Sequence, residues 1–203
     1  MKFHHALFAL SAVLSAVSAN ATGAKNEPDA LEKMHDYAIC LVTKRPNIVR
    51  DTLKLDFQTQ EYKKQIDDLG TAKSSCVQRG RMRMATVLFA GSLAEALFEL
   101  DYRGKQAVAI LPADWTANPI AARSETEMVA LCMVQKHPTE IQAIFSTKPA
   151  SDTEKAAFVP LIADMPSCVS SGSTLQFNRP LLRSIFALGM YRAARHFGGA
   201  ADA

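Results

Sequence analysis

The chain has 203 residues, of which 48% are hydrophobic and 21% are charged, and its formal net charge is +3. This composition is typical of a globular protein and differs from that of disordered or strongly basic chains. The near-neutral charge argues against a nucleic-acid partner, and the length suffices for one or two buried cores.

The first 21 residues are predicted to be a secretory signal peptide. Lys2 precedes an apolar run, Ala6 to Val17, and small residues follow it, so we expect cleavage after Ala19 or Ala21. The alternative is a retained membrane anchor, but the run is shorter than the roughly 20 residues that span a bilayer. We therefore expect a periplasmic protein, or alternatively a secreted one, that spans no membrane after signal removal.

The four cysteines form two pairs with the same spacing. Cys76 follows Cys40 by 36 residues, and Cys168 follows Cys132 by 36 residues. A shift of 92 residues carries the first pair onto the second. Without a gap, the same shift aligns further identical residues, among them Pro46 with Pro138, Gly80 with Gly172 and Ser92 with Ser184. This shared register predicts a duplicated unit.

Cysteines of an exported protein usually form disulfides, and the repeat selects one of the three possible pairings. If each unit is self-contained, the bonds are Cys40–Cys76 and Cys132–Cys168. Each would close a loop for which chain entropy predicts a stabilisation of about 3.5–4 kcal/mol. A zinc site is the alternative for four cysteines, but the chain has no C-x-x-C pair.

In the first unit, we expect four helices. Pro28 stands in the first turn of a helix that ends before Pro46, and Pro46 itself starts the second helix. Thr59 is the predicted N-cap of the third helix. The fourth, from about Arg81 to Leu100, is the longest apolar element of the unit.

The segment between the two units is too apolar for a free linker. It contains the run Val108 to Pro112 and the only tryptophan, Trp115. We expect this segment to lie across the junction of the two units, with Trp115 half-buried there.

The second unit carries clearer helix-start signals. Residues 124–127 and 151–154 each form a capping box, with serine first and glutamate fourth. Pro160 is expected to interrupt the third helix of this unit. The last helix is expected to begin near Asn178 and to end at Gly198.

The expected fold is all-α, with two pseudo-symmetric four-helix repeats that each contain a disulfide. The fourth helix of each repeat is richer in apolar residues than one small core requires, so we expect the two to share a central layer in one domain. The predicted boundaries are a signal peptide at 1–21, repeat 1 at 26–103, an apolar linker at 104–123, repeat 2 at 124–197 and a disordered tail at 198–203.

The candidate site is a group of arginines, Arg79, Arg81 and Arg83, at the expected start of the fourth helix. Guanidinium groups beside the free N–H groups of a helix start can bind a phosphate or carboxylate. The alternative is a solvated basic turn that pairs with acids such as Asp67 and Asp68. Standard catalytic motifs and metal-ligand spacings of histidine are absent from the sequence, so we expect no cofactor and no metal.

Two segments carry a resemblance. Cys76-Val77 with Gly80, and the run from Ser92 to Phe98, resemble a group of uncharacterised exported proteins from alphaproteobacteria. The resemblance implies export and a helical, disulfide-stapled architecture, and it implies no activity.

Two function classes stay open. The favoured one is a non-catalytic periplasmic helical module that binds a protein or cell-envelope component, because no polar constellation for chemistry is visible. The alternative is a small-molecule or anion-binding carrier or enzyme with a pocket between the repeats. An apolar cavity with convergent polar groups at the junction would favour the alternative, and a solid junction with an exposed apolar patch would favour the module.

Overall fold

The computed structural model describes residues 22–71, 76 and 85–199, with side chains from Pro28 onwards. The predicted signal peptide and the last four residues lie outside these ranges. Within them the chain forms nine α-helices, a short 3-10 helix and no strand. The elements are α1 (Thr22–Lys44), α2 (Pro46–Lys54), α3 (Gln60–Thr71), α4 (Thr86–Asp101), α5 (Ala107–Ile110), α6 (Glu125–Lys136), α7 (Pro138–Phe145), α8 (Asp152–Asp164), η1 (Met165–Cys168) and α9 (Arg179–Phe197).

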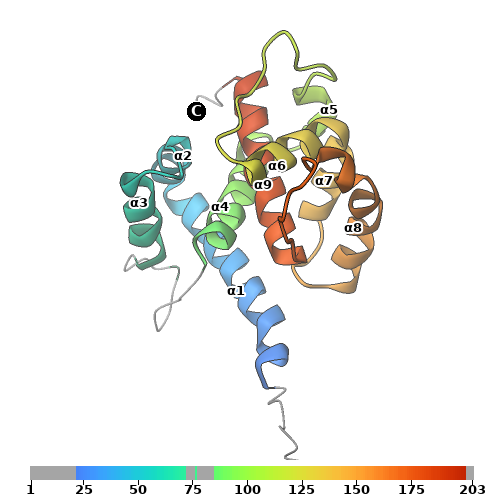
Figure 1. The fold of residues 1–203 in the computed structure, drawn as a ribbon. Helices are drawn as coiled ribbons and strands as arrows, with labels where there is room; N and C mark the ends of the chain where they lie inside the picture. Colours follow the sequence, from blue (N-terminus) through green and yellow to red (C-terminus); the bar gives the residue numbers. More distant parts are fainter. Residues whose placement is uncertain (1–21, 72–75, 77–84, 200–203) are drawn as a thin grey trace, which may run out of the picture.

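Helices α4 and α9 lie side by side at the centre of the molecule (Figure 1). α2 and α3 lie on one side of this pair, α6, α7 and α8 lie on the other, and α1 packs along α4. The described part of the chain is therefore one all-α domain in which the expected central layer is present.

The core is built around these two helices because most side chains of α4 are apolar. Phe89 and Phe98 of α4 and Phe186 and Met190 of α9 are fully buried. The two helices approach so closely that a Cβ atom on Gly91 would lie 2.4 Å from Cα of Ser184. Only glycine fits at this crossing.

Both predicted disulfides are confirmed. Cys40 is bonded to Cys76 and Cys132 to Cys168, with a Cα–Cα distance of 5.7 Å in each pair. No thiol is left for zinc, since all four cysteines are paired. Two disulfides indicate an oxidising compartment outside the cytoplasm.

Local signals place most helix starts where the sequence predicts them. Pro46 and Pro138 are the first residues of α2 and α7. The Thr59 hydroxyl accepts the Tyr62 N–H at the start of α3. The predicted serine caps accept backbone N–H groups at the starts of α6 and α8, and Asn178 does the same for α9.

Two of the expected helix features are wrong. α4 begins at Thr86, with Ala85 as its N-cap, rather than at Arg81. The earlier start was predicted from apolar pattern alone, without a capping residue. Pro160 does not interrupt its helix, because α8 continues through it to Asp164. Pro160 and Ala156, the residue one turn before it, are both exposed, so water can satisfy the carbonyl that loses its partner.

The segment between the two halves packs on the end of α9. Trp115 is only 6% exposed, so it is more buried than expected. Its ring lies 5.0 Å from the ring of Phe197, and its indole N–H donates to the Pro112 carbonyl at 2.8 Å. None of the helices in the described ranges has the length and apolar character needed to cross a bilayer.

Candidate functional site

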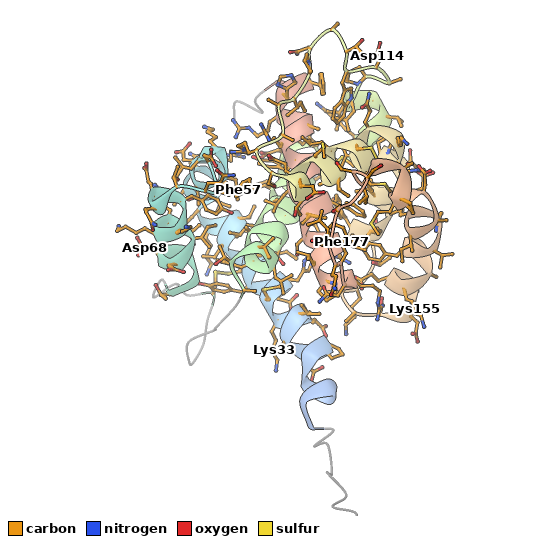
Figure 2. All side chains as sticks on the ribbon, in the orientation of Figure 1. Lys33, Phe57, Asp68, Asp114, Lys155 and Phe177 are labelled. Atoms are coloured by element: carbon orange, nitrogen blue, oxygen red, sulfur yellow. A yellow bond between two sulfur atoms is a disulfide. The ribbon has the colours of Figure 1, made fainter. Side chains whose placement is uncertain are left out.

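A cavity of about 860 Å³ lies between the α2–α3 segment and the pair α6 and α9. Its lining comes from residues 53–62, 86–87, 119–130 and 181–196, and therefore from both halves of the chain. Phe57, labelled in Figure 2, lines it from the turn that joins α2 to α3. This volume is within the range of pockets that enclose small-molecule ligands.

Most of the lining is apolar. Leu181, Ile185 and Leu188 are spaced by four and three residues, so they share one face of α9. Phe57 and Tyr62 line the cavity from the α2–α3 side. Burial raises the pKa of Tyr62 to about 12, so its phenol is neutral at neutral pH. An apolar ligand body would therefore contact hydrophobic and aromatic side chains from two sides.

The polar part of the cavity is organised around Glu127. Its Oε2 accepts the backbone N–H of Arg123 at 2.6 Å, and its Oε1 lies 3.1 Å from the guanidinium of Arg123. The Arg192 guanidinium, from α9, donates to the same Oε1. Burial acts to raise the pKa of Glu127, but the hydrogen bonds from the Arg123 backbone, Arg123 and Arg192 outweigh it and hold the pKa below its ordinary value.

Glu127 is also the glutamate of a capping box. The Ser124 hydroxyl accepts the Glu127 N–H at 3.1 Å, and the Glu127 carboxylate accepts the backbone N–H of Arg123, the residue just before the N-cap. The same carboxylate therefore starts α6, holds the end of the linker and binds α9. Through these three contacts Glu127 holds α6, α9 and the end of the linker together where they line the cavity.

Three further basic side chains line the cavity. Lys54 is paired with Asp51 at 2.8 Å, and Nε2 of His196 lies 3.2 Å from the Asn118 carbonyl oxygen. The Arg195 guanidinium lies 5.9 Å from the ring centroid of Tyr191. Within the described ranges, no carboxylate is within ion-pair distance of Arg195.

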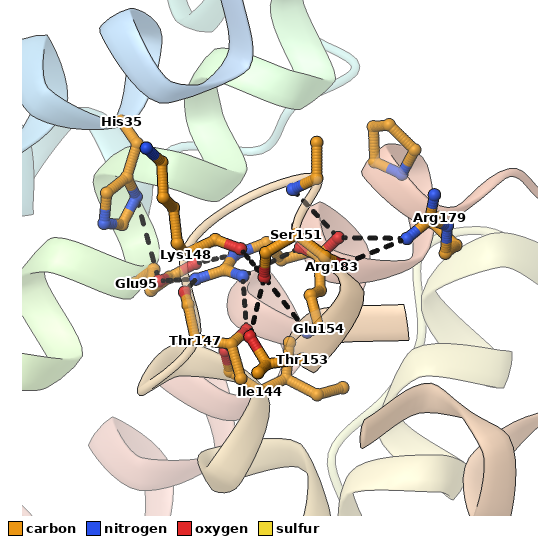
Figure 3. Close-up of polar contacts among 12 residues, drawn as sticks. His35, Glu95, Ile144, Thr147, Lys148, Ser151, Thr153, Glu154, Arg179 and Arg183 are labelled. Carbon is orange, nitrogen blue, oxygen red and sulfur yellow. Dashed lines mark hydrogen bonds and ion pairs between the residues drawn. The ribbon is translucent and has the colours of Figure 1, made fainter. Parts of the chain in front are cut away.

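A second polar cluster is buried on the other side of α9 (Figure 3). The Arg183 guanidinium donates to both carboxylate oxygens of Glu95 on α4, at 2.8 and 2.6 Å, and to Glu154 on α8 at 2.8 Å. It also donates to the carbonyl and hydroxyl oxygens of Thr147. His35 lies 3.7 Å from Glu95.

This cluster is structural. Arg183, Glu95 and Glu154 are each less than 10% exposed, and the described residues contain no buried side-chain polar atom without a hydrogen-bond partner. Burial acts to lower the pKa of Arg183, but the two carboxylates raise it overall. Every buried side-chain polar atom of the cluster already has a partner, and the Arg183 bonds join α4, α8 and α9.

A third group of polar residues lies at the surface, where α6 ends. His137 and Asp164 are joined at 2.8 Å, and Nζ of Lys136 donates to Oγ of Ser167 at 2.7 Å. The hydrogen bond from His137 and the charge of Lys136 lower the pKa of Asp164. The residues resemble a catalytic set in type, but Asp164 is well exposed and none of the four lines the cavity. They connect the end of α6 to η1.

The predicted arginine site, Arg79, Arg81 and Arg83, lies outside the described residues. α4 starts at Thr86, so the predicted helix start at Arg81 is wrong, while the arginine site itself stays a prediction. The described residues also contain no cluster of side chains suited to a metal ion. The cavity residues Glu127, Arg192 and Arg195 were missed, although one signal was present in the sequence. The cations recur on the α9 face that carries Leu181, Ile185 and Leu188.

Neither a protein family, nor a curated protein, nor a solved structure matches this chain.

Proposed function

We propose that the chain is an exported periplasmic protein that binds a small molecule in the cavity between its two halves. The cavity of about 860 Å³, with an apolar body and convergent polar groups, is the observation that carries this proposal. The two disulfides, together with the signal peptide predicted at 1–21, support export.

The protein-binding alternative has less support. Large apolar side chains that are well exposed are spread over six helices among the described residues. They are Ile39, Ile48, Val87, Val108, Met128, Val159 and Ile162.

Binding, rather than catalysis, fits the polar groups of the cavity. Ser124 is occupied as the N-cap of α6, and Glu127 is held by two arginines with a lowered pKa. A catalytic base requires a free acceptor atom whose pKa lies near the working pH. Ser124 and Glu127 therefore serve to fix the two arginines and the start of α6, and they are not free to accept a proton from a substrate.

The duplication predicted from the sequence is part of this proposal. α1 and α6 end at Lys44 and Lys136, α2 and α7 begin at Pro46 and Pro138, and α3 and α8 begin at Gln60 and Asp152. Each pair of positions differs by 92 residues, as the two cysteine pairs do. We infer two repeats, at 26–103 and 124–197, with the cavity formed where they meet.

A neutral apolar dye tests whether the cavity is open to ligands. N-phenyl-1-naphthylamine fluoresces strongly once it leaves water, so the oxidised mature protein should enhance its fluorescence with a stoichiometry of one. Leu188→Trp places a larger side chain in the lining and should weaken dye binding at least tenfold.

The matched control is Val159→Trp, which adds the same ring on the exposed face of α8. Helical circular dichroism would show that both variants are folded. No saturable dye binding, or equal binding by wild type and Leu188→Trp, would show that the cavity is not a binding site.

A further inference from the structure

The face of α9 that lines the cavity is apolar at its N-terminal end and positively charged at its C-terminal end. Leu181, Ile185 and Leu188 come first, and Arg192 and Arg195 follow on the same face. The helix rises about 15 Å from Ile185 to Arg195, which is of the order of the length of an extended dodecyl chain. The cavity therefore has an apolar end and a cationic end, separated by the length of one alkyl chain.

Positive charge is in excess at the cationic end. Arg123, Arg192 and Arg195 line the cavity beside one lining carboxylate, Glu127, whereas the further cation Lys54 is paired with Asp51. Charge of one sign in an apolar-walled cleft attracts a ligand of the opposite sign. Arg123 and Arg192 use their donors on Glu127 and on the carbonyls of Leu55 and Ala121, so they are already engaged.

Arg195 is the cation best placed to receive an external anion. Its guanidinium lies over the ring of Tyr191, and the Tyr191 hydroxyl donates to Asp101 at 3.0 Å, which fixes the ring beneath it. The Lys54 hydrogen bond and, to a lesser extent, the charge of Arg195 lower the pKa of Asp51. Asp51 is nevertheless bonded to Lys54 and does not pair with Arg195.

We infer that the ligand is a single-chain amphiphile whose anionic head group, a carboxylate or a phosphate, is bound by Arg195. This inference rests on the proposed binding function of the cavity. The alkyl chain lies against Leu188 and Ile185, and the head group lies at the level of Arg195 and His196. A guanidinium binds either head group through two parallel hydrogen bonds.

Four probes with the same chain test the head group: dodecanoate, dodecyl phosphate, dodecanol and dodecyltrimethylammonium. The three charged probes are titrated below their micelle concentrations, and dodecanol below its solubility limit, against the protein loaded with N-phenyl-1-naphthylamine. We expect at least one of the two anions to displace the dye at a concentration tenfold or more below that of dodecanol, and the cation to be weakest.

Arg195→Gln should remove the preference for the anion and leave dodecanol binding unchanged. Arg195→Lys should retain part of the preference, because it keeps the charge. Arg103→Gln is the control, since it removes an equal charge from an exposed position outside the cavity.

Failure of the head-group assignment can be told apart from failure of the proposed binding function. If dodecanol binds as tightly as both anions, or if Arg195→Gln keeps the preference for the anion, the assignment of the head group is wrong while the cavity still binds ligands. If neither the dye nor any of the four probes binds, the proposed function itself is wrong.

Discussion

Arg183 holds three helices together from inside the protein. A buried charge is tolerated only where partners replace its lost hydration, and here the guanidinium binds two buried carboxylates and a backbone carbonyl. Glu154, one of these carboxylates, also accepts the Ala150 N–H just before the start of α8. Through this residue the capping box of α8 is coupled to the centre of the domain.

Replacing Arg183 with methionine should therefore be costly. Methionine fills much of the same space but leaves Glu95 and Glu154 buried without their main partner, and removing one partner of a buried ion pair typically costs about 3–5 kcal/mol. Urea unfolding of Arg183→Met at neutral pH, followed by circular dichroism, measures this loss. The exposed Arg103→Met provides the control and should change the free energy of unfolding by less than about 0.5 kcal/mol. A similarly small change in Arg183→Met would contradict a structural role for the cluster.

At the scale of helices, the crossing of α4 and α9 depends on Gly91. A Cβ atom at this position would meet the Ser184 backbone at 2.4 Å, and backbone cannot move aside as a flexible side chain can. At Gly189, on α9, a Cβ atom would meet Cβ of Ala130 at 3.2 Å, which a small adjustment relieves. The two glycines thus differ in how tightly the neighbouring helix approaches.

We predict that Gly91→Ala lowers the free energy of unfolding by at least about 2 kcal/mol, even though alanine favours a helix over glycine by up to about 1 kcal/mol. Gly189→Ala should have a clearly smaller effect, because its nearest contacts, at 3.2 Å to the Ala130 Cβ and 3.4 Å to the Ala130 backbone carbon, need a shift of only a few tenths of an ångström. Denaturant unfolding of both variants gives the comparison. Equal stability of Gly91→Ala and wild type would show that the crossing is looser than described.

The helix boundaries show which features of the fold could be predicted from the sequence. Helix starts set by local chemistry, such as Pro46, Ser124 and Asn178, were predicted correctly because a proline or a capping side chain acts within one turn. The start of α4 was wrong because no such residue marks it. Pro160 was misjudged because tolerance of a proline depends on whether the affected carbonyl faces water.

The cavity could not be predicted in the same way. Its lining joins segments more than 100 residues apart, and the role of Glu127 follows from where Arg192 arrives on α9. In the sequence, the capping box alone accounts for a glutamate at position 127. Nothing in that motif indicates that Glu127 also binds Arg192. The cationic residues on the apolar face of α9 are the one local sign that this face lines more than a packed core.

At the scale of the whole molecule, the two halves share one core. Each half is closed by its own disulfide, yet α4 of the first half and α9 of the second bury their apolar faces against each other. Glu95 and Arg183 form an ion pair across the same boundary, and the Tyr191 hydroxyl of the second half donates to Asp101 of the first. Neither half can bury its long apolar helix alone.

The whole domain should therefore unfold as one unit. Trp115 reports on the end of α9 and circular dichroism reports on all helices, so the two signals should be lost in one coincident transition when the oxidised protein is heated. The separate pieces 26–103 and 104–197 should each be poorly folded or associate with themselves, because each exposes the face of its central helix. Mixing the two oxidised pieces should restore cooperative unfolding if the faces recognise each other. Two pieces that are each monomeric and as cooperative as the whole protein would show instead that the α4–α9 contact merely joins two independent domains.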